Sequence, residues 1–222
     1  MTPELVVLDM AGTTVADDGL VVTAFTEAIR AAGVPDEEYP RMLRYVLDTM
    51  GQSKIVVFRA LLGDEDLARR ANAAFEAAYG DLVAAGESKP VPGAEAVVRG
   101  LRETGVKVAF TTGFAPATQQ AILDALGWRD LADLALAPGD GVRGRPFPDL
   151  VLTAAMRLEV TDVRRIAVVG DTASDVLCGL RSGASVVAGV LTGAGRREDL
   201  AEATHVLDSV SALPAVLEGE TR

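Results

Sequence analysis

The chain has 222 residues, which is enough for one compact domain with a smaller inserted one and too few for two full-sized domains. Hydrophobic residues make up 49% of it and charged residues 24%, a composition that excludes a disordered chain. The formal net charge of −11 excludes the broadly basic surface of proteins that bind nucleic acid or anionic membranes. We therefore expect neither nucleic acid nor a membrane as a partner.

Cysteine content and apolar segments bear on where the protein resides. Cys178 is the only cysteine, so an internal disulfide is excluded and a reducing compartment suits the chain. The first apolar run, residues 5–8, stops at Asp9 and does not resemble an export signal. The most apolar late segment, residues 184–194, is too short to span a bilayer. These observations predict a soluble, cytoplasmic protein, with Cys178 as a small core residue inside a helix.

The first expected strand, residues 5–8, is followed by a long segment without strand patterns. Between residues 19 and 86 only helical patterns occur, and they cover residues 21–31, 37–47, 55–62 and 65–84. A purely helical insertion after the first strand predicts a lid on an α/β core. We expect a helical cap domain at residues 17–89, hinged near 17–19 and 89–92, and a core domain formed by residues 1–16 and 90–222.

After the insertion, β-branched apolar runs alternate regularly with helical patterns. Further strands are expected at residues 106–110, 134–137, 165–169, 185–188 and, more weakly, 204–207. Helices are expected at residues 93–103, 116–126, 147–158, 173–181 and 210–217, and Gly105, Gly127 and Gly183 follow three of them as C-terminal caps. Near-continuous apolar strands are typical of a sheet buried on both faces. The pattern predicts an α/β fold with a doubly wound, Rossmann-like parallel sheet.

Polar side chains gather where these expected strands end. The segments read DMAGTT from Asp9, TTG from Thr111, GRPFPD from Gly144 and GDTASD from Gly170. Singly, each has a simpler interpretation, because turns and helix caps also use Asp and Thr. Ligands of open parallel sheets bind beyond the carboxyl ends of the strands. Three carboxylates, two hydroxyls and one guanidinium gathered there predict a site for magnesium and a phosphate group.

With these four motifs in this order, and with the helical insertion, the chain resembles the haloacid-dehalogenase superfamily of phosphoryl hydrolases over essentially its whole length. The resemblance implies that Asp9 is the nucleophile and forms an aspartyl-phosphate, which water then hydrolyses. It implies that Thr112, with backbone groups near Gly113, holds the phosphate and that Arg145 neutralises its charge. It also implies a Mg²⁺ cofactor, held by Asp9, the carbonyl of Ala11 and Asp171, with Asp175 supporting them through water or from behind the ligands.

One position departs from the phosphatases of this superfamily. Most of them carry a second aspartate two residues after the nucleophile, which protonates the leaving alkoxide and activates the attacking water. This chain has Ala11 there. Without that acid, an ordinary phosphate monoesterase would lack its usual proton donor.

The phosphonoacetaldehyde hydrolase branch is similar in having alanine at this position, followed by Gly-Thr-Thr, and in the TTG and Arg-Pro motifs. It also carries Met-Gly-x-x-Lys in the lid, as this chain does from Met50 to Lys54. In that branch the lysine forms a Schiff base with the substrate aldehyde, so that carbon leaves phosphorus as an enamine and no acid is needed at a leaving oxygen. The resemblance implies a catalytic role for Lys54 and places these residues at the substrate: Ala11, Gly12, Met50 and Gly113.

The residues around Lys54 favour an uncharged amine. Gly51 ends one helical pattern and Ser53 is expected to N-cap the helix at residues 55–62, which puts Lys54 in the first turn. The helix dipole and a closing lid both lower the pKa of an amine at that position. Two roles for Lys54 stay open: it forms the imine, or it only recognises the substrate, as the Gly-x-Ser-Lys or Gly-x-Ser-Arg cation does in lids of related phosphatases and sugar phosphomutases.

One mismatch with the phosphonatase pattern leaves the identity of the substrate open. The phosphonatase pattern has a histidine three residues after the lysine, where this chain has Val57, and His205 lies near the last strand, where we expect it to be structural.

The leading hypothesis is a magnesium-dependent hydrolase of a small aldehyde phosphonate. The alternative enzyme is a phosphate-monoester phosphatase, similar to phosphoglycolate phosphatases. A non-catalytic sensor of a phosphorylated metabolite is disfavoured, because binding alone needs no nucleophile. The expected partner is thus a small phosphonate or phosphate, and a homodimer through an apolar lid helix at residues 21–31 stays open.

Overall fold

The computed structural model describes residues 2–139 and 141–219, and a six-stranded parallel sheet forms its centre. The strands are β1 (Leu5–Asp9), β4 (Lys107–Thr111), β5 (Leu134–Leu136), β6 (Ile166–Gly170), β7 (Val186–Val190) and β8 (His205–Leu207). They lie in the order β5-β4-β1-β6-β7-β8, so the chain moves outward first to one side of β1 and then to the other. The predicted doubly wound parallel sheet is confirmed.

Helices cover both faces of this sheet. The helices of the sheet lobe are α5 (Ala94–Glu103), α6 (Pro116–Ala125), α7 (Asp149–Arg157), α8 (Ala173–Ser182) and α9 (Leu213–Gly219), with 3-10 turns η2 (Val163–Arg165) and η3 (Val210–Ala212). Val6 and Leu8 belong to the same buried cluster as α5, α6 and α9, whereas Leu5 and Val7 pack with α7. Alternate side chains of β1 therefore enter opposite layers, as the period of a strand dictates.

The predicted helix ends also agree with the structure. Gly183 is the C-cap residue of α8 with a φ of 82°, and Gly105 and Gly127 follow their helices with φ of 83° and 67°. These are left-handed conformations, which glycine adopts without a Cβ clash. Cys178 lies within α8 as a free, buried thiol, which confirms its prediction as a core residue.

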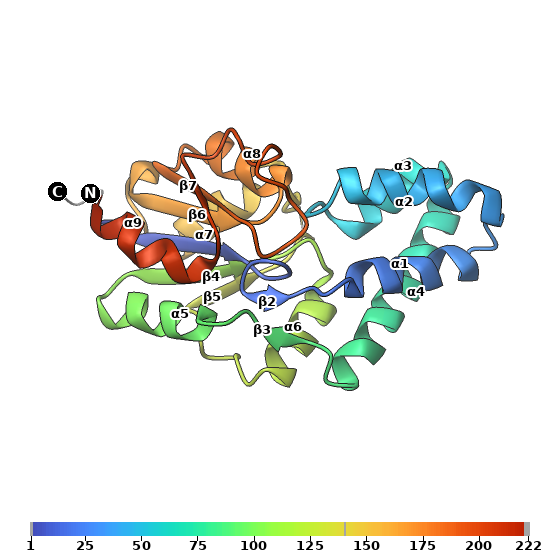
Figure 1. The fold of residues 1–222 in the computed structure, drawn as a ribbon, viewed down its shortest axis with the longest axis horizontal. Helices are drawn as coiled ribbons and strands as arrows, with labels where there is room; N and C mark the ends of the chain where they lie inside the picture. The colour runs from blue at the N-terminus through green and yellow to red at the C-terminus, as the bar shows by residue number, and fades with distance from the viewer. Residues whose placement is uncertain (1, 140, 220–222) are drawn as a thin grey trace.

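The segment after β1 forms a separate helical lobe beyond the carboxyl ends of the strands (Figure 1). It consists of α1 (Leu20–Ala31), the 3-10 turn η1 (Asp36–Glu38), α2 (Tyr39–Asp48), α3 (Lys54–Leu62) and α4 (Glu65–Ala84). Aromatic contacts hold its interior together: Phe25 and Phe58 stack with ring centroids 5.8 Å apart, and Phe58 meets Phe75 edge to face at 6.1 Å. Within the described residues, none of the helices is long and apolar enough to cross a membrane.

The two connections to this helical lobe pair with each other, which the sequence analysis missed. β2 (Val15–Ala16) and β3 (Lys89–Pro90) form a two-stranded antiparallel sheet, and the Val91 amide donates to the Thr14 carbonyl at 2.9 Å. Strands of two residues are too short to produce an alternating pattern in a sequence. The pairing holds the entry and exit of the lobe side by side, close to the end of β1.

Candidate active site

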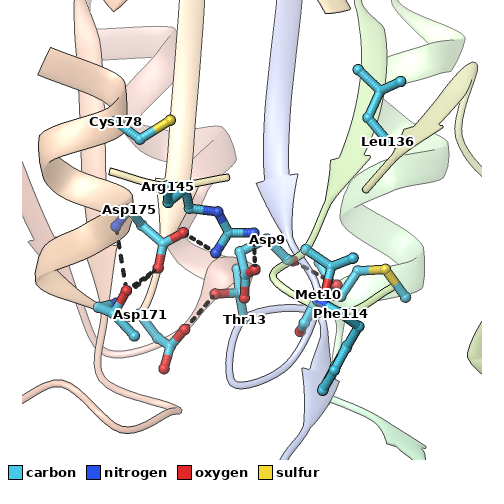
Figure 2. A network of polar contacts seen from close by, with 12 residues as sticks. Asp9, Met10, Thr13, Phe114, Leu136, Arg145, Asp171, Asp175 and Cys178 are labelled. Carbon is cyan, nitrogen blue, oxygen red and sulfur yellow. Dashed lines mark hydrogen bonds and ion pairs between the residues drawn. The ribbon is translucent and has the colours of Figure 1, made fainter. Parts of the chain in front are cut away.

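A buried arginine joins two of the predicted acidic residues. Asp9 ends β1, and Asp175 lies in the first turn of α8 (Figure 2). The Arg145 guanidinium lies between them, with one nitrogen 2.6 Å from Asp9 Oδ1 and another in an ion pair with Asp175. All three side chains are at least 95% buried. Burial without such pairing would be costly for each charge, so the three residues stabilise one another.

Asp171 lies beside this group and has its own fixed partners. It follows β6, accepts a hydrogen bond at 2.7 Å from the Ala194 amide, and has its other oxygen 3.4 Å from Thr13 Oγ1. Gly193 is so close that a Cβ there would lie within 3.0 Å of the carboxylate. The sequence analysis assigns no role in the site to residues 193–197. The available signal is the Gly-Ala-Gly run at residues 193–195 soon after β7, since small residues permit a close approach of backbone to ligand or side chain.

The three aspartates form a cluster that can hold a cation. Oxygens of Asp9, Asp171 and Asp175 all lie within 4.8 Å of one another. Burial raises the pKa of Asp9 to about 7, although Arg145 opposes the rise, and burial together with the charge of Asp9 raises the pKa of Asp171. Crowded carboxylates that resist ionisation are what a bound divalent cation relieves. The donor set is all oxygen, which suits a hard metal ion.

Asp175 is held differently from the other two aspartates. Its carboxylate accepts hydrogen bonds from the Thr172 amide at 3.1 Å and from Thr172 Oγ1 at 2.5 Å, while Thr172 Oγ1 accepts from the Asp175 amide. This capping box begins α8. The simpler interpretation of these residues as helix caps is therefore confirmed, and the same cap fixes the carboxylate that pairs with Arg145.

The predicted phosphate-binding residues follow β4. Thr112 is buried, and its Oγ1 accepts a hydrogen bond from the Phe114 amide at 3.2 Å. The Gly113 carbonyl accepts from the Lys54 amide at 3.2 Å, which joins this loop to the helical lobe. A Cβ on Gly113 would lie within 3.0 Å of the Gln52 carbonyl oxygen. The helical lobe is thus closed against the strand ends, and only glycine allows so close a contact.

Lys54 enters the same site from the opposite side, as the first residue of α3. Ser53 takes the predicted N-cap position, although its side chain makes no capping hydrogen bond. The Lys54 Nζ lies 5.4 Å from the ring centroid of Phe114 and 5.9 Å from that of Phe75. Burial lowers the pKa of Lys54, and the charge of Arg145 adds to this, while Asp17 is the strongest charge acting against it. The predicted direction of the pKa change is confirmed.

A single small cavity of about 30 Å³ collects most of the predicted residues. Its lining from the predicted set consists of Asp9, Ala11, Met50, Lys54, Thr112, Gly113, Arg145 and Asp171. Gly12 and Asp175 are outside this lining. Gly12 has a φ of 92°, and a Cβ there would lie 2.5 Å from Asp171 Oδ2, so it makes room for the carboxylate rather than facing the cavity. Val57, three residues after Lys54, is buried in the lobe interior.

The cavity also contains residues that sequence reasoning missed. Asp17 and Phe114 line it, and Ala194 borders it through the loop that binds Asp171. Asp17 follows the first motif by only three residues, so its proximity to Asp9 along the chain was a usable signal. Phe114 follows Gly113 directly, but an apolar residue after a polar motif carries no signal for a site.

This arrangement combines a buried carboxylate, an acidic cluster that can hold a cation and an amine around one small volume. Asp9 is oriented by Arg145, and Lys54 lies at the far side with an environment that favours its neutral form. A neutral amine is a nucleophile toward carbonyl carbon, and a carboxylate is one toward phosphorus. The geometry therefore suits a substrate that carries a phosphoryl group at one end and a second polar group at the other.

Comparisons with known proteins agree on the family. A family model described as haloacid dehalogenase-like hydrolase matches residues 3–183. The chain is 32% identical over 198 residues to a phosphonoacetaldehyde hydrolase of Syntrophobacter fumaroxidans, an alignment that covers 80% of this chain and 69% of the relative. It is 30% identical over 211 residues to a phosphonoacetaldehyde hydrolase of Bordetella pertussis, with 86% and 73% covered. The crystal structure of a phosphonoacetaldehyde hydrolase-like protein from Oleispira antarctica superposes with a TM-score of 0.83 at 26% identity, over 99% of this chain and 92% of that one.

Proposed function

The chain belongs to the haloacid dehalogenase-like hydrolase family, and from that premise we propose that it is a magnesium-dependent hydrolase that cleaves the carbon–phosphorus bond of a small aldehyde phosphonate, phosphonoacetaldehyde or a relative of it. One observation carries the proposal: Lys54 and Asp9 line the same cavity, in a chain that has Ala11 in place of an acid. The relatives named as phosphonoacetaldehyde hydrolases support the same substrate class.

Asp9 is the nucleophile of the proposed reaction. Its carboxylate attacks phosphorus and forms an aspartyl-phosphate, which water then hydrolyses to inorganic phosphate. Arg145 holds that carboxylate and contributes positive charge next to the phosphoryl oxygens. Thr112, which is buried, and the backbone at Gly113 line the same cavity and would bind these oxygens.

Lys54 would convert the carbon bound to phosphorus into a better leaving group. A carbanion leaves phosphorus very poorly, but a carbonyl that has condensed with an amine becomes a protonated imine. When the carbon–phosphorus bond breaks, its electron pair forms a carbon–carbon double bond and the imine nitrogen recovers its lone pair, so the carbon departs as a neutral enamine. No proton has to be delivered to an oxygen at this step, and Ala11 is no handicap. Burial lowers the pKa of Lys54, which favours the neutral amine that starts the sequence.

The aspartate cluster fits a magnesium ion. Asp9 and Asp171 would hold it, together with the Ala11 carbonyl, and Asp175 would support it from its position beside Arg145. The raised pKa values of Asp9 and Asp171 indicate excess negative charge that a divalent cation would balance. When bound, the ion supplies positive charge that lets the phosphoryl group approach the carboxylates.

Borohydride trapping with mass spectrometry tests the role of Lys54. Incubation with phosphonoacetaldehyde and magnesium, followed by reduction, is expected to fix the two-carbon adduct on Lys54. Lys54→Arg keeps the positive charge but cannot form an imine, so phosphate release from this substrate should stop. Lys89→Arg is the matched control, because Lys89 is exposed and lies in β3, outside the cavity lining. Absence of an adduct in the wild-type protein would refute the imine.

A phosphate-monoester phosphatase is the second candidate, and one observation favours it. Val57 is buried in the lobe, so no titratable group stands three residues after Lys54 as it does in the phosphonatase pattern. In that case Lys54 only binds an anionic part of the substrate. Phosphate release from phosphoglycolate or other monoesters, retained in Lys54→Arg and lost in Asp9→Asn, would establish this alternative in place of carbon–phosphorus cleavage.

A further inference from the structure

Asp17 is an acidic residue of the cavity for which the chemistry described so far has no use. It lies in the first connection between the two lobes, just after β2, and lines the cavity together with Asp9 and Lys54. Its Oδ1 accepts a hydrogen bond from the Val21 amide at 3.1 Å, and its carbonyl accepts one from the Leu20 amide at 2.7 Å. These bonds fix the carboxylate at the start of α1.

The second oxygen of Asp17 is available for chemistry. Within the part of the chain that the structure describes, Oδ2 has no hydrogen-bond partner. Lys54 likewise takes part in no ion pair within 4.0 Å among these residues, although Asp17 and Lys54 each alter the pKa of the other. The two groups therefore line the same cavity without forming an ion pair, and each is close enough to alter the pKa of the other.

Other acids near the cavity are already engaged. The Glu76 carboxylate binds Thr118 Oγ1 and the Ala115 amide, and Asp171 binds the Ala194 amide. Position 11, the usual place for an acid, is alanine. Asp17 is thus the acid that combines a free oxygen with a place in the lining beside Lys54. Burial also raises the pKa of Asp17, which favours a carboxyl group that can hold and return a proton.

We propose that Asp17 is the proton-transfer residue for Lys54, an inference that rests on the proposed imine mechanism. After the neutral amine has added to the aldehyde, the carbinolamine must lose its hydroxyl. Asp17, as the carboxylic acid, gives its proton to that hydroxyl, the carbon–oxygen bond breaks, and water leaves. The nitrogen lone pair forms the imine double bond, and the Asp17 carboxylate balances the new positive charge.

The same carboxylate serves the release of product. The enamine first takes up a proton at its terminal carbon and becomes a protonated imine, and the hydrolysis of the aspartyl-phosphate by water supplies that proton overall. Water then adds to the imine carbon, and Asp17 takes the proton that this water loses. The nitrogen receives the electron pair of the broken double bond, so the carbinolamine and the carboxylic acid are regenerated. Asp17 ends each cycle protonated, and no reagent other than substrate and water is consumed.

The variant Asp17→Asn tests proton transfer without removing the hydrogen bond that holds the start of α1. An asparagine oxygen can still accept the Val21 amide, so the start of α1 is kept, but the amide cannot deliver an acidic proton. We expect the rate of borohydride-trappable adduct formation on Lys54, and kcat, to fall roughly 100-fold, with KM nearly unchanged. Asp18→Asn is the matched control, because Asp18 is the exposed neighbour and lies outside the cavity lining.

The outcomes distinguish this inference from the function on which it rests. If wild-type protein forms no adduct on Lys54, the proposed function fails. If wild-type protein forms the adduct and Asp17→Asn forms it at the same rate, only the role of Asp17 is refuted. Asp17→Ala provides a second measurement, because added formate should restore part of its adduct rate if a carboxylic acid is what the site lacks. No rescue by formate, with the variant folded by circular dichroism, would count against proton transfer by Asp17.

Discussion

Replacing the candidate nucleophile is expected to stabilise the metal-free protein while it abolishes hydrolysis. Burial raises the pKa of Asp9 from 3.8 to about 7 despite its contact with Arg145. The folded state therefore binds the Asp9 proton more tightly than the unfolded state does. Stability is lost as the pH rises from about 4 to about 7, where the unfolded chain ionises first, and the loss is complete above pH 7. Asparagine has no such charge to bury.

The size of the effect follows from the pKa difference. A rise of about three pKa units corresponds to roughly 4 kcal/mol of unfolding free energy at high pH, since each unit is worth about 1.4 kcal/mol. This is an upper limit, because side chains relax and water enters around an ionised group. Between pH 5 and pH 8 the gain of Asp9→Asn over wild type should grow by about 2 kcal/mol. Arg145 keeps its ion pair with Asp175 in the variant, so its charge is not left unpaired.

Urea unfolding with a chelator at pH 5 and pH 8 measures this prediction. Asp18→Asn is the matched control, since Asp18 is exposed and stands outside the cavity. Magnesium should stabilise wild type more at pH 8 than at pH 5, and should stabilise Asp9→Asn less than wild type. The reasoning is refuted if Asp9→Asn gains no more at pH 8 than Asp18→Asn does, or if its gain is the same at both pH values.

Three further predictions concern other contacts. Gly113→Ala brings a Cβ within 3.0 Å of the Gln52 carbonyl oxygen. Because the helical lobe then cannot close, kcat/KM should fall at least about 10-fold. The control Gly80→Ala, in open space on α4, should keep full activity, and its free energy of unfolding in urea should rise by about 0.5–1 kcal/mol. Arg145→Lys retains the charge but cannot pair with two carboxylates as a planar fork does, so phosphate release should drop about 100-fold or more while the fold persists by circular dichroism. Burial raises the pKa of Cys178 to about 12, so the native thiol should resist iodoacetamide at pH 8 and react only in urea, and a modified native protein would contradict its placement.

Most of the fold could be predicted from local patterns. The six strands of the main sheet and the helix Glu65–Ala84 were expected within a residue or two of their observed bounds, because apolar runs, glycine caps and acidic first turns act over a few neighbouring residues. The pair β2 and β3 was missed because two residues carry no period. Ser53 takes the N-cap position as predicted, but the residue type alone does not ensure a side-chain hydrogen bond there.

The acidic and basic residues of the site were recognisable as a set, but their partners were not. Asp9, Arg145 and Asp171 could be expected at one edge of the sheet, since parallel strands bring their carboxyl ends together. No pattern indicates that Arg145 joins Asp9 to Asp175, because that contact spans residues from three separate strand ends.

The amino-acid sequence alone was enough to predict the strands, the helices and the types of side chain at each strand end. Hydrophobic period and motif spacing are properties of short segments, so they can be recognised from neighbouring residues along the chain. The way the helical lobe closes over the sheet was hidden from such patterns, and with it the position of Lys54 across from Asp9, the role of Gly12 in making room for Asp171, and the exposure of Asp17 to the cavity. Burial, repulsion and pKa depend on distances in space, and those distances arise when segments far apart in the chain pack together.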